Sequence, residues 1–582
     1  MATFTFEGKD FFLNDKKFNI YSGAIHYFRI MPESWEDRLK KLKNCGFNTV
    51  ETYVPWNLHE PKPNAFVFDG IADVERFLEL AEKVGLYAIV RPTPYICSEW
   101  EFGGFPAWLL QDKNIRLRCR NTSYLEKVCN YYDELLPRLK KHLITNGGNV
   151  IMLQIENEYG SYGNDKKYLQ TLRDYYVKAG IDVPLFTSDA PWIVSLDAGT
   201  VEGALPTVNF GSKVKKHFDT FRKIYGDKYP FMCSEFWGGW FDCWGGERHT
   251  RDADEVVKEI SDILDLDGNF NLYMFAGGTN FGFTAGANCD LMPDGKEKFM
   301  PTTTSYDFCS PVDEYGNCTE LYYKLQALLC EQQGAKQKIK YEPIKIQKIE
   351  TIDFTERATL RHNQNRIGKT HKDVLIDGME SYGQTHGLIE YNFSFQCEKE
   401  LDIPVDLEIN GISDVAKIHV NGELVKRHDR LETGERTVKI SLQGIDKANV
   451  SVLVDSYGRV NYGRNLGDNK GISSAYYNAQ IFTADVICYP LDNLELLEYD
   501  NGESYPQFIK GTFKAHRDTE GKLSLKGFTR GMVWINGFNI GRYNNVGPQL
   551  ELHVPSSILN ESNEIIVMEL EKVDEQVINI NK

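Results

Sequence analysis

Short apolar runs alternate with amphipathic helical patterns from residue 18 to residue 275, and this alternation limits the possible folds more than any other feature of the sequence. Eight such runs can be counted, at residues 19–25, 48–53, 87–91, 150–154, 185–187, 207–210, 231–234 and 271–275. Apolar runs separated by helical patterns are typical of parallel strands that are buried on both faces. Eight strand–helix units in about 300 residues predict a (β/α)8 TIM barrel, an α/β fold whose active site lies at the carboxyl ends of its strands.

The pattern changes beyond residue 335, where short alternating strands and turns replace the strand–helix units. A Lys-rich segment at residues 334–340 indicates a linker. Two later stretches have alternating apolar residues that lead into an Asn-Gly turn, at Asn421-Gly422 and at Asn536-Gly537. They resemble a loose internal repeat. We therefore predict a barrel at residues 1–335 and two all-β sandwich domains at 336–485 and 486–582, and leave open whether one sandwich is threaded through the other.

The charge of the chain narrows the range of partners. With 66 Lys and Arg against 83 Asp and Glu, the formal charge is −17, which disfavours nucleic acid and anionic membranes. No apolar run approaches the ~18 residues of a membrane span, and the N-terminus lacks a secretory pattern, so we expect a soluble, cytoplasmic protein. The 12 cysteines form no Cys-x-x-Cys pair, which indicates neither a zinc site nor a disulfide framework. A small neutral ligand is the favoured partner, and a homodimer is left open.

Two glutamates follow predicted barrel strands. Glu158 comes after the run at 150–154, and Glu235 comes after the run at 231–234 and before an aromatic segment at 236–241. Because the carboxyl ends of barrel strands surround one opening, both side chains are expected to face the same cavity. A retaining glycosidase needs one protonated and one ionised carboxyl group about 5 to 5.5 Å apart. A glutamate after a strand is also an ordinary solvated loop residue, and spacing alone does not choose between the two interpretations.

Six motifs in the barrel region resemble glycoside hydrolase family 35 in order and spacing. They are Ser-Gly-Ala-Ile-His at residues 22–26, Thr-Tyr-Val-Pro-Trp-Asn at 52–57, the segments 91–100 and 102–108, Ile-Glu-Asn-Glu-Tyr-Gly at 155–160, Ser-Glu-Phe-Trp at 234–237, and the segments 271–275 and 277–282. Residues 454–463 and 531–548 resemble the family's C-terminal β-domains, so the resemblance covers nearly the whole chain.

The resemblance implies a TIM barrel followed by two jelly-roll, galactose-binding-like sandwiches, with no metal or organic cofactor. The implied activity is that of a retaining exo-β-galactosidase, which removes terminal non-reducing galactose from a small oligosaccharide or other short galactoside. For the sandwiches themselves, a purely structural role is the default and sugar binding is the alternative.

The resemblance also implies roles for individual residues. Glu158 matches the family's acid/base and Glu235 its nucleophile, whereas Glu156, on the same extended segment, is expected to be structural. The expected substrate-binding residues are Tyr53, Cys97, Ser98, Glu99, Asn157, Tyr273, Trp237 and Phe308, with Asn157 near the 2-hydroxyl and Tyr273 orienting the nucleophile. Trp240 and Trp244 are further candidates for the pocket mouth. For each of these residues, ordinary barrel packing is the alternative.

The chain departs from the family pattern at residues 305–311, which read Ser-Tyr-Asp-Phe-Cys-Ser-Pro where many members have Ser-Tyr-Asp-Tyr-Asp-Ala-Pro. Phe308 thus lacks a hydroxyl that commonly meets the sugar, and Ala276 occupies a position that is often larger. Together with Cys309, these residues leave the identity of the sugar open. The alternative functions are another exo-β-glycosidase of the same mechanism, such as a β-glucosaminidase, and a carbohydrate-binding protein without catalysis.

Overall fold

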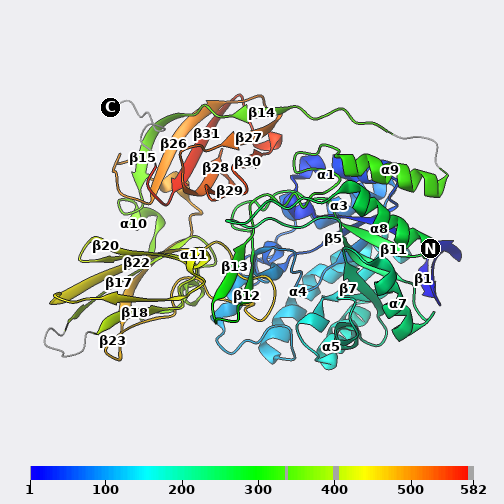
Figure 1. Ribbon diagram of the computed structural model, residues 1–582, viewed down its shortest axis with the longest axis horizontal. Helices are drawn as coiled ribbons and strands as arrows, with labels where there is room; N and C mark the ends of the chain where they lie inside the picture. The colour runs from blue at the N-terminus through cyan, green and yellow to red at the C-terminus, as the bar shows by residue number, and fades with distance from the viewer. Residues whose placement is uncertain (1, 335–338, 398–404, 574–582) are drawn as a thin grey trace.

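The computed structural model describes residues 2–334, 339–397 and 405–573, and the largest part of this structure is a closed barrel of eight parallel strands (Figure 1). Its strands are β4 (Tyr21–Ile25), β5 (Thr49–Tyr53), β6 (Tyr87–Arg91), β7 (Val150–Asn157), β8 (Leu185–Asp189), β9 (Leu205–Phe210), β10 (Met232–Trp237) and β11 (Asn269–Ala276). They follow one another around the barrel in chain order, and β11 closes against β4. The predicted (β/α)8 barrel is confirmed, and each of the eight apolar runs forms one of its strands.

Helices cover the outside of the barrel because each carries an apolar face. In α8 (Ala253–Asp265), Val256, Ile260 and Ile263 are buried, and the Asp252 carboxylate accepts hydrogen bonds from backbone NH groups at the helix start. The other long helices of this layer are α1 (Pro32–Asn44), α3 (Val74–Val84), α4 (Thr122–Lys141), α5 (Lys166–Lys178), α6 (Ile193–Gly199), α7 (Val214–Tyr225) and α9 (Glu320–Gln333). Within the described part of the chain, no helix has the length and apolar character needed to cross a membrane.

Two strands that carry the candidate site run further than their apolar residues suggested. β7 continues through Asn157, and β10 continues to Trp237. The polar residues in these extensions can remain buried because arginine side chains pair with their carboxylates. Arg91, from the barrel strand β6, pairs with Glu235, and Arg118, from the layer around the barrel, pairs with Glu156. As a result, Glu158 directly follows β7, whereas Glu235 lies within β10 and not after it.

The first all-β domain is a sandwich of two sheets, seen at the lower left of Figure 1. Its larger sheet contains, in order, β16 (Lys369–Leu375), β25 (Thr483–Tyr489), β17 (Leu388–Gln396), β22 (Lys447–Asp455), β19 (Val415–Val420) and β20 (Glu423–Asp429). The facing sheet contains β21 (Thr437–Ser441), β18 (Asp406–Asn410), β23 (Ser474–Tyr477) and β24 (Gln480–Ile481). Alternating apolar residues from both sheets form one buried core.

The second all-β domain lies at the upper left of Figure 1 and combines strands from two distant parts of the chain. One sheet contains β15 (Asp353–Thr359), β26 (Gln507–Lys514), β31 (Ser562–Glu569), β28 (Arg530–Ile535) and β29 (Phe538–Asn544). The other contains β14 (Ile346–Ile349), β27 (Glu520–Ser524) and β30 (Glu551–Val554).

This pairing corrects the contiguous division of the β region into 336–485 and 486–582. Residues 346–359 belong to the second sandwich, so the first sandwich is inserted between its strands, and β25 crosses the predicted boundary at 485. Alternating patterns reveal strands but not their partners, and here the partners lie about 150 residues apart. Most of the predicted linker, residues 335–338, lies outside the described residues.

A hairpin ties the barrel to the first sandwich. Its strands, β12 (Ala287–Leu291) and β13 (Glu297–Pro301), leave the carboxyl-end face of the barrel, and Ala287 pairs with Val460 of the sandwich. Trp244, Phe299 and Tyr457 are among the side chains that form a small buried cluster at this junction. The sandwich loop around residue 460 therefore lies at the barrel face that carries the candidate site.

Candidate active site

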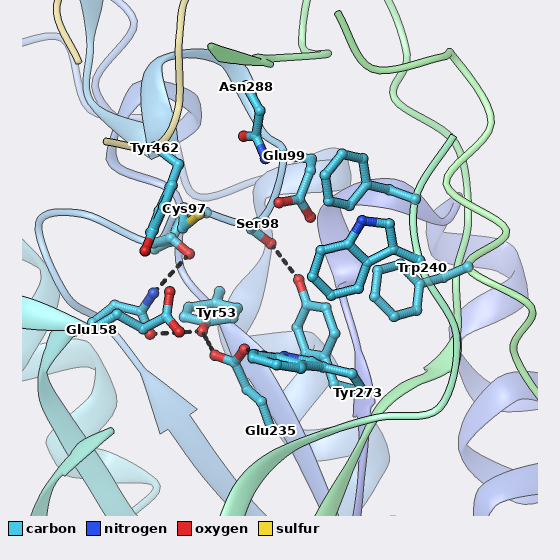
Figure 2. A pocket seen from close by; sticks show the side chains of 15 residues that line it. Tyr53, Cys97, Ser98, Glu99, Glu158, Glu235, Trp240, Tyr273, Asn288 and Tyr462 are labelled. Carbon is cyan, nitrogen blue, oxygen red and sulfur yellow. Dashed lines mark hydrogen bonds between the residues drawn. The ribbon is translucent and has the colours of Figure 1, made fainter. Parts of the chain in front are cut away.

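A pocket of about 180 Å³ opens at the carboxyl ends of the barrel strands (Figure 2). Its lining residues are Tyr53, Ile96, Cys97, Ser98, Glu99, Asn157, Glu158, Glu235, Trp237, Trp240, Phe241, Tyr273, Asn288, Phe308 and Tyr462. This set includes all ten site residues expected from the sequence, drawn from five barrel strands or the loops after them. Their roles remain predictions, but the structure brings them around one cavity.

Glu235 lies in the pocket floor among hydrogen-bond donors. Its Oε1 is 2.7 Å from Nη2 of Arg91 and 2.5 Å from the Tyr53 hydroxyl, and its Oε2 accepts a bond of 3.2 Å from Nε1 of Trp237. Arg91 is fully buried and Glu235 is 6% exposed, so solvent screens this ion pair weakly. The arrangement holds a carboxylate in one orientation with an oxygen edge facing the cavity, as a nucleophile requires.

Glu158 occupies a different environment in the same pocket. It is the first residue after β7, in a left-handed backbone conformation with φ of 48°, and Asn209 Nδ2 donates to its Oε1 at 3.2 Å. Burial raises the pKa of Glu158 to about 8, and the negative charge of Glu235 adds to the rise. Figure 2 shows Tyr53 between Glu158 and Glu235, with Asn288 and Tyr462 above them in the view. The pocket thus holds one carboxyl group whose pKa is raised by burial and one that is paired with an arginine.

Arg91 links the floor of the pocket, although the sequence did not single it out. Its Nη2 donates to Asn157 Oδ1 at 2.6 Å, and its Nε donates to Gln154 Oε1 at 2.5 Å. The Tyr53 hydroxyl is also 2.9 Å from Asn157 Oδ1. The sequence did contain a signal for Arg91: it is a basic residue at the end of an otherwise apolar barrel strand. Such a buried cation needs an anionic partner inside the barrel.

Three consecutive pocket residues adopt left-handed backbone conformations. The φ angles of Cys97, Ser98 and Glu99 are 55°, 60° and 48°, which non-glycine residues rarely adopt in succession. Arg29 donates to the Ser98 carbonyl, and the Tyr306 hydroxyl donates to Glu99 Oε2 at 2.5 Å. Burial raises the pKa of Glu99 to about 7, although the bond from Tyr306 opposes the shift. These contacts hold a turn that presents three successive side chains to the cavity.

Tyr273 differs from its expected role. Among the described residues, its hydroxyl bonds with Ser98 Oγ at 3.0 Å and with the Tyr306 hydroxyl at 2.9 Å, and the tyrosine bonded to Glu235 is Tyr53. Tyr273 therefore supports the wall formed by the left-handed turn, and it does not orient the candidate nucleophile through a hydrogen bond.

Glu156 faces away from the pocket, because successive side chains of a strand point to opposite sides. Its two carboxylate oxygens accept bonds of 2.9 and 2.8 Å from Nε and Nη2 of Arg118, and the Tyr168 hydroxyl adds a third at 3.2 Å. It is 1% exposed. The structure gives Glu156 a buried ion pair between the barrel strand and its surrounding layer.

Of Phe308, Ala276 and Cys309, only Phe308 lines the pocket. Its ring centroid lies 5.2 Å from that of Tyr273 and 5.4 Å from that of Tyr306. Ala276 is buried at the end of β11, and the Cys309 thiol donates to the His249 carbonyl at 3.1 Å outside the pocket lining. Ala276 and Cys309 therefore do not line the pocket, and Phe308 alone among the three can contact the sugar.

Four lining residues were missed by the sequence: Ile96, Phe241, Asn288 and Tyr462. Asn288 comes from the β12–β13 hairpin, and Tyr462 comes from the inserted sandwich, more than 220 residues after Glu235. Trp244, considered for the mouth, is instead buried in the junction between barrel and sandwich. The described residues contain no group of three or more His, Cys, Asp or Glu side chains placed to hold a metal ion.

Comparison with known proteins agrees with this architecture. The family model described as glycosyl hydrolases family 35 matches residues 10–332, the first all-beta domain of beta-galactosidase matches residues 377–492, and its galactose-binding domain matches residues 506–564. The chain is 35% identical to a beta-galactosidase of Homo sapiens, covering 97% of this chain and 86% of that protein. It is 35% identical to a beta-galactosidase of Felis catus (97% and 88% covered) and 36% identical to beta-galactosidase 17 of Arabidopsis thaliana (98% and 87% covered). On its barrel, its all-β domains and these matches, the chain belongs to glycosyl hydrolases family 35 and is a glycoside-hydrolysing enzyme.

Proposed function

We propose that this enzyme is a retaining exo-β-galactosidase that removes terminal β-galactose from short galactosides, with Glu158 as acid/base and Glu235 as nucleophile. The observation that carries the proposal is the pair of glutamates in one pocket whose surroundings separate their roles. The named relatives, beta-galactosidases that align with 97–98% of this chain, support galactose as the sugar.

The size of the pocket supports removal of one terminal unit. About 180 Å³ corresponds to roughly six water volumes of ~30 Å³ each, which leaves little room beyond one sugar ring. Ser98, Glu99 and Asn157 provide hydroxyl, carboxyl and amide groups for the sugar hydroxyls, and Phe308 and Trp237 provide apolar faces for its ring carbons.

In the first chemical step, a carboxylate oxygen of Glu235 attacks the anomeric carbon. The bond to the leaving oxygen breaks as Glu158 transfers its proton to that oxygen, giving a covalent glycosyl-enzyme ester and a free alcohol. Glu158, now ionised, then takes a proton from water, whose oxygen displaces Glu235 from the anomeric carbon. Two inversions give net retention, and both glutamates return to their starting protonation states.

A second candidate is another exo-β-glycosidase of the same mechanism, such as a β-glucosaminidase. The observation that favours it is Phe308, which offers an apolar wall where many relatives of the family have a hydroxyl. This residue changes recognition of the sugar and leaves the two glutamates in place.

Hydrolysis of a panel of nitrophenyl β-glycosides tests the proposal. We expect the highest kcat/KM on the β-galactoside, and faster hydrolysis of the glucoside, fucoside or glucosaminide would reject galactose. Proton NMR of the first-formed sugar should show the β-anomer, and an α-anomer would exclude the double displacement. Glu235→Gln is the matched inactive variant: retention of more than about a tenth of wild-type activity would contradict its assignment, because loss of a nucleophile costs several orders of magnitude.

A further inference from the structure

Exposed aromatic side chains gather around the active-site face. Within the described part of the chain, the exposed aromatic residues are Tyr162, Trp192, Trp240 and Tyr462, with exposed fractions of 38%, 64%, 40% and 38%. Tyr162 follows β7, Trp192 follows β8 and Trp240 follows β10, all at carboxyl ends of barrel strands. Exposed aromatic groups that cluster in this way mark binding surfaces more often than scattered ones do. Trp240 and Tyr462 already line the catalytic pocket, so Tyr162 and Trp192 remain to be explained.

Tyr162 lines a separate groove of about 590 Å³. One wall of the groove is the segment 115–119, the second is formed by Tyr159 and residues 162–165, and the third is Leu466 with Gly467 of the inserted sandwich. Trp192 is not among its lining residues. Because side chains from three separate segments line the groove, an extended ligand can contact more than one of them.

The groove adjoins the catalytic pocket on the side of Glu158. Tyr462, in the pocket wall, is within hydrogen-bonding reach of Ser161, and the same sandwich loop reaches the groove four residues later at Leu466. On the barrel side, Glu158 lines the pocket and Tyr159 lines the groove. The two cavities are therefore lined by nearby residues of the same two segments, Glu158 with Tyr159 and Tyr462 with Leu466.

The groove offers the groups that a neutral sugar chain needs. The guanidinium carbon of Arg118 lies 4.3 Å from the centre of the Tyr162 ring, and Arg118 is itself fixed by its ion pair with Glu156. Tyr162 is thus a positioned ring with an exposed surface on which the carbon face of a sugar can pack. Asn164 and Arg116 supply exposed polar groups for its hydroxyls.

The direction of the chemistry relates this groove to the leaving group. A general acid must reach the oxygen of the bond that breaks, so the departing part of the substrate lies beside Glu158. The residues that follow Glu158 lead directly to Tyr159 and Tyr162 in the groove wall. A chain that leaves the pocket past Glu158 therefore runs toward the segment that also lines this groove.

We propose that the groove binds the second and later sugar units of the leaving group, so that the enzyme favours β-galactosides whose leaving group is a neutral oligosaccharide over the corresponding disaccharide. This inference rests on the proposed function, because the role of Glu158 defines the leaving-group side.

The test compares wild type, Tyr162→Ala and Trp192→Ala on three substrates: nitrophenyl β-galactoside, a galactosyl disaccharide, and a galactosyl tetrasaccharide with the same terminal linkage. For wild type, kcat/KM should be higher on the tetrasaccharide than on the disaccharide. Tyr162→Ala should lower that value about three- to tenfold, the range for loss of one aromatic contact, and leave the other two substrates unchanged. Trp192→Ala is the matched control, because it removes an exposed aromatic group on the same face outside the groove, and it should change none of the three.

The groove assignment is overturned if wild type does not favour the tetrasaccharide, if Tyr162→Ala affects all three substrates alike, or if Trp192→Ala causes the same selective loss. Calorimetry on the inactive Glu235→Gln variant gives a second readout: the tetrasaccharide should bind more tightly than the disaccharide, and adding Tyr162→Ala should remove the difference. Failure of wild type to hydrolyse the nitrophenyl galactoside would instead reject the proposed function.

Discussion

Glu158→Gln removes the proton that we assign to the leaving group and keeps the size and polarity of the side chain. Burial, reinforced by the charge of Glu235, raises the pKa of Glu158 to about 8. At pH 7 this side chain is then mostly protonated, whereas a carboxyl group with the ordinary pKa of 4.5 is almost entirely ionised.

The loss in the variant should depend on the leaving group. On a galactosyl disaccharide, kcat/KM should fall by about 10²- to 10⁴-fold, the usual contribution of general acid catalysis. On a dinitrophenyl β-galactoside, the leaving phenolate is stable and needs little protonation, so the loss should be at least roughly tenfold smaller. The pH profile provides an independent signature: wild-type kcat/KM on the disaccharide should fall as pH rises through about 8, because Glu158 loses its proton, and Glu158→Gln should lack this limb.

Steady-state kinetics on both substrates from pH 5 to 9 measures these effects. Glu156→Gln is the matched control, because it makes the same chemical change two residues earlier, at a side chain that pairs with Arg118 and does not line the pocket. It should keep the wild-type ratio of activities on the two substrates. Equal losses on both substrates in Glu158→Gln, or a basic limb that persists in the variant, would remove Glu158 from the acid role.

Three further outcomes follow from the contacts. Glu156→Gln should lower the melting temperature strongly, because removing one charge of a buried ion pair lowers the free energy of unfolding by about 3 to 5 kcal/mol and leaves Arg118 without its counter-charge. A melting temperature equal to that of wild type would show that the pair is dispensable for stability. Glu158→Gln should gain thermal stability relative to wild type as pH rises from about 5 to 9. The reason is that a carboxyl group whose pKa is raised from 4.5 to about 8 favours the folded state only while it is protonated. Differential scanning calorimetry of both proteins at both pH values tests the sign, and a gain confined to low pH contradicts it. Phe308→Tyr should lower KM for a β-galactoside a few-fold, since one hydrogen bond contributes about 0.5 to 1.5 kcal/mol and the pocket already accommodates the ring. A higher KM together with preference for another glycoside would favour the alternative sugar.

The sequence by itself determined the barrel and most of the pocket. The alternation of strands and helices can be recognised locally along the chain. Once eight strand–helix units are counted, they are expected to close into a barrel, and this places the carboxyl end of every strand at one face. A residue directly after a strand, such as Glu158, was therefore predictable without knowledge of any contact, whereas the residues at 97–99 were expected from the resemblance to the family. The motifs that identified the family gave Glu158 and Glu235 their expected roles and left Glu156 as a structural residue.

The tertiary structure decided what depends on distant contacts and on burial. Arg91, Tyr53 and Glu235 meet from three different strands, and the raised pKa of Glu158 comes from enclosure and from the charge of Glu235. Tyr462 reaches the pocket from the inserted sandwich, where neighbouring Asn461 donates to Cys97 Sγ across 364 residues of sequence. The insertion of one sandwich into the other was also decided by the tertiary structure, because the packing of whole sheets determines which strands pair. Local patterns specify which residues are extended or helical, but desolvation and long-range pairing exist only after the chain has closed on itself.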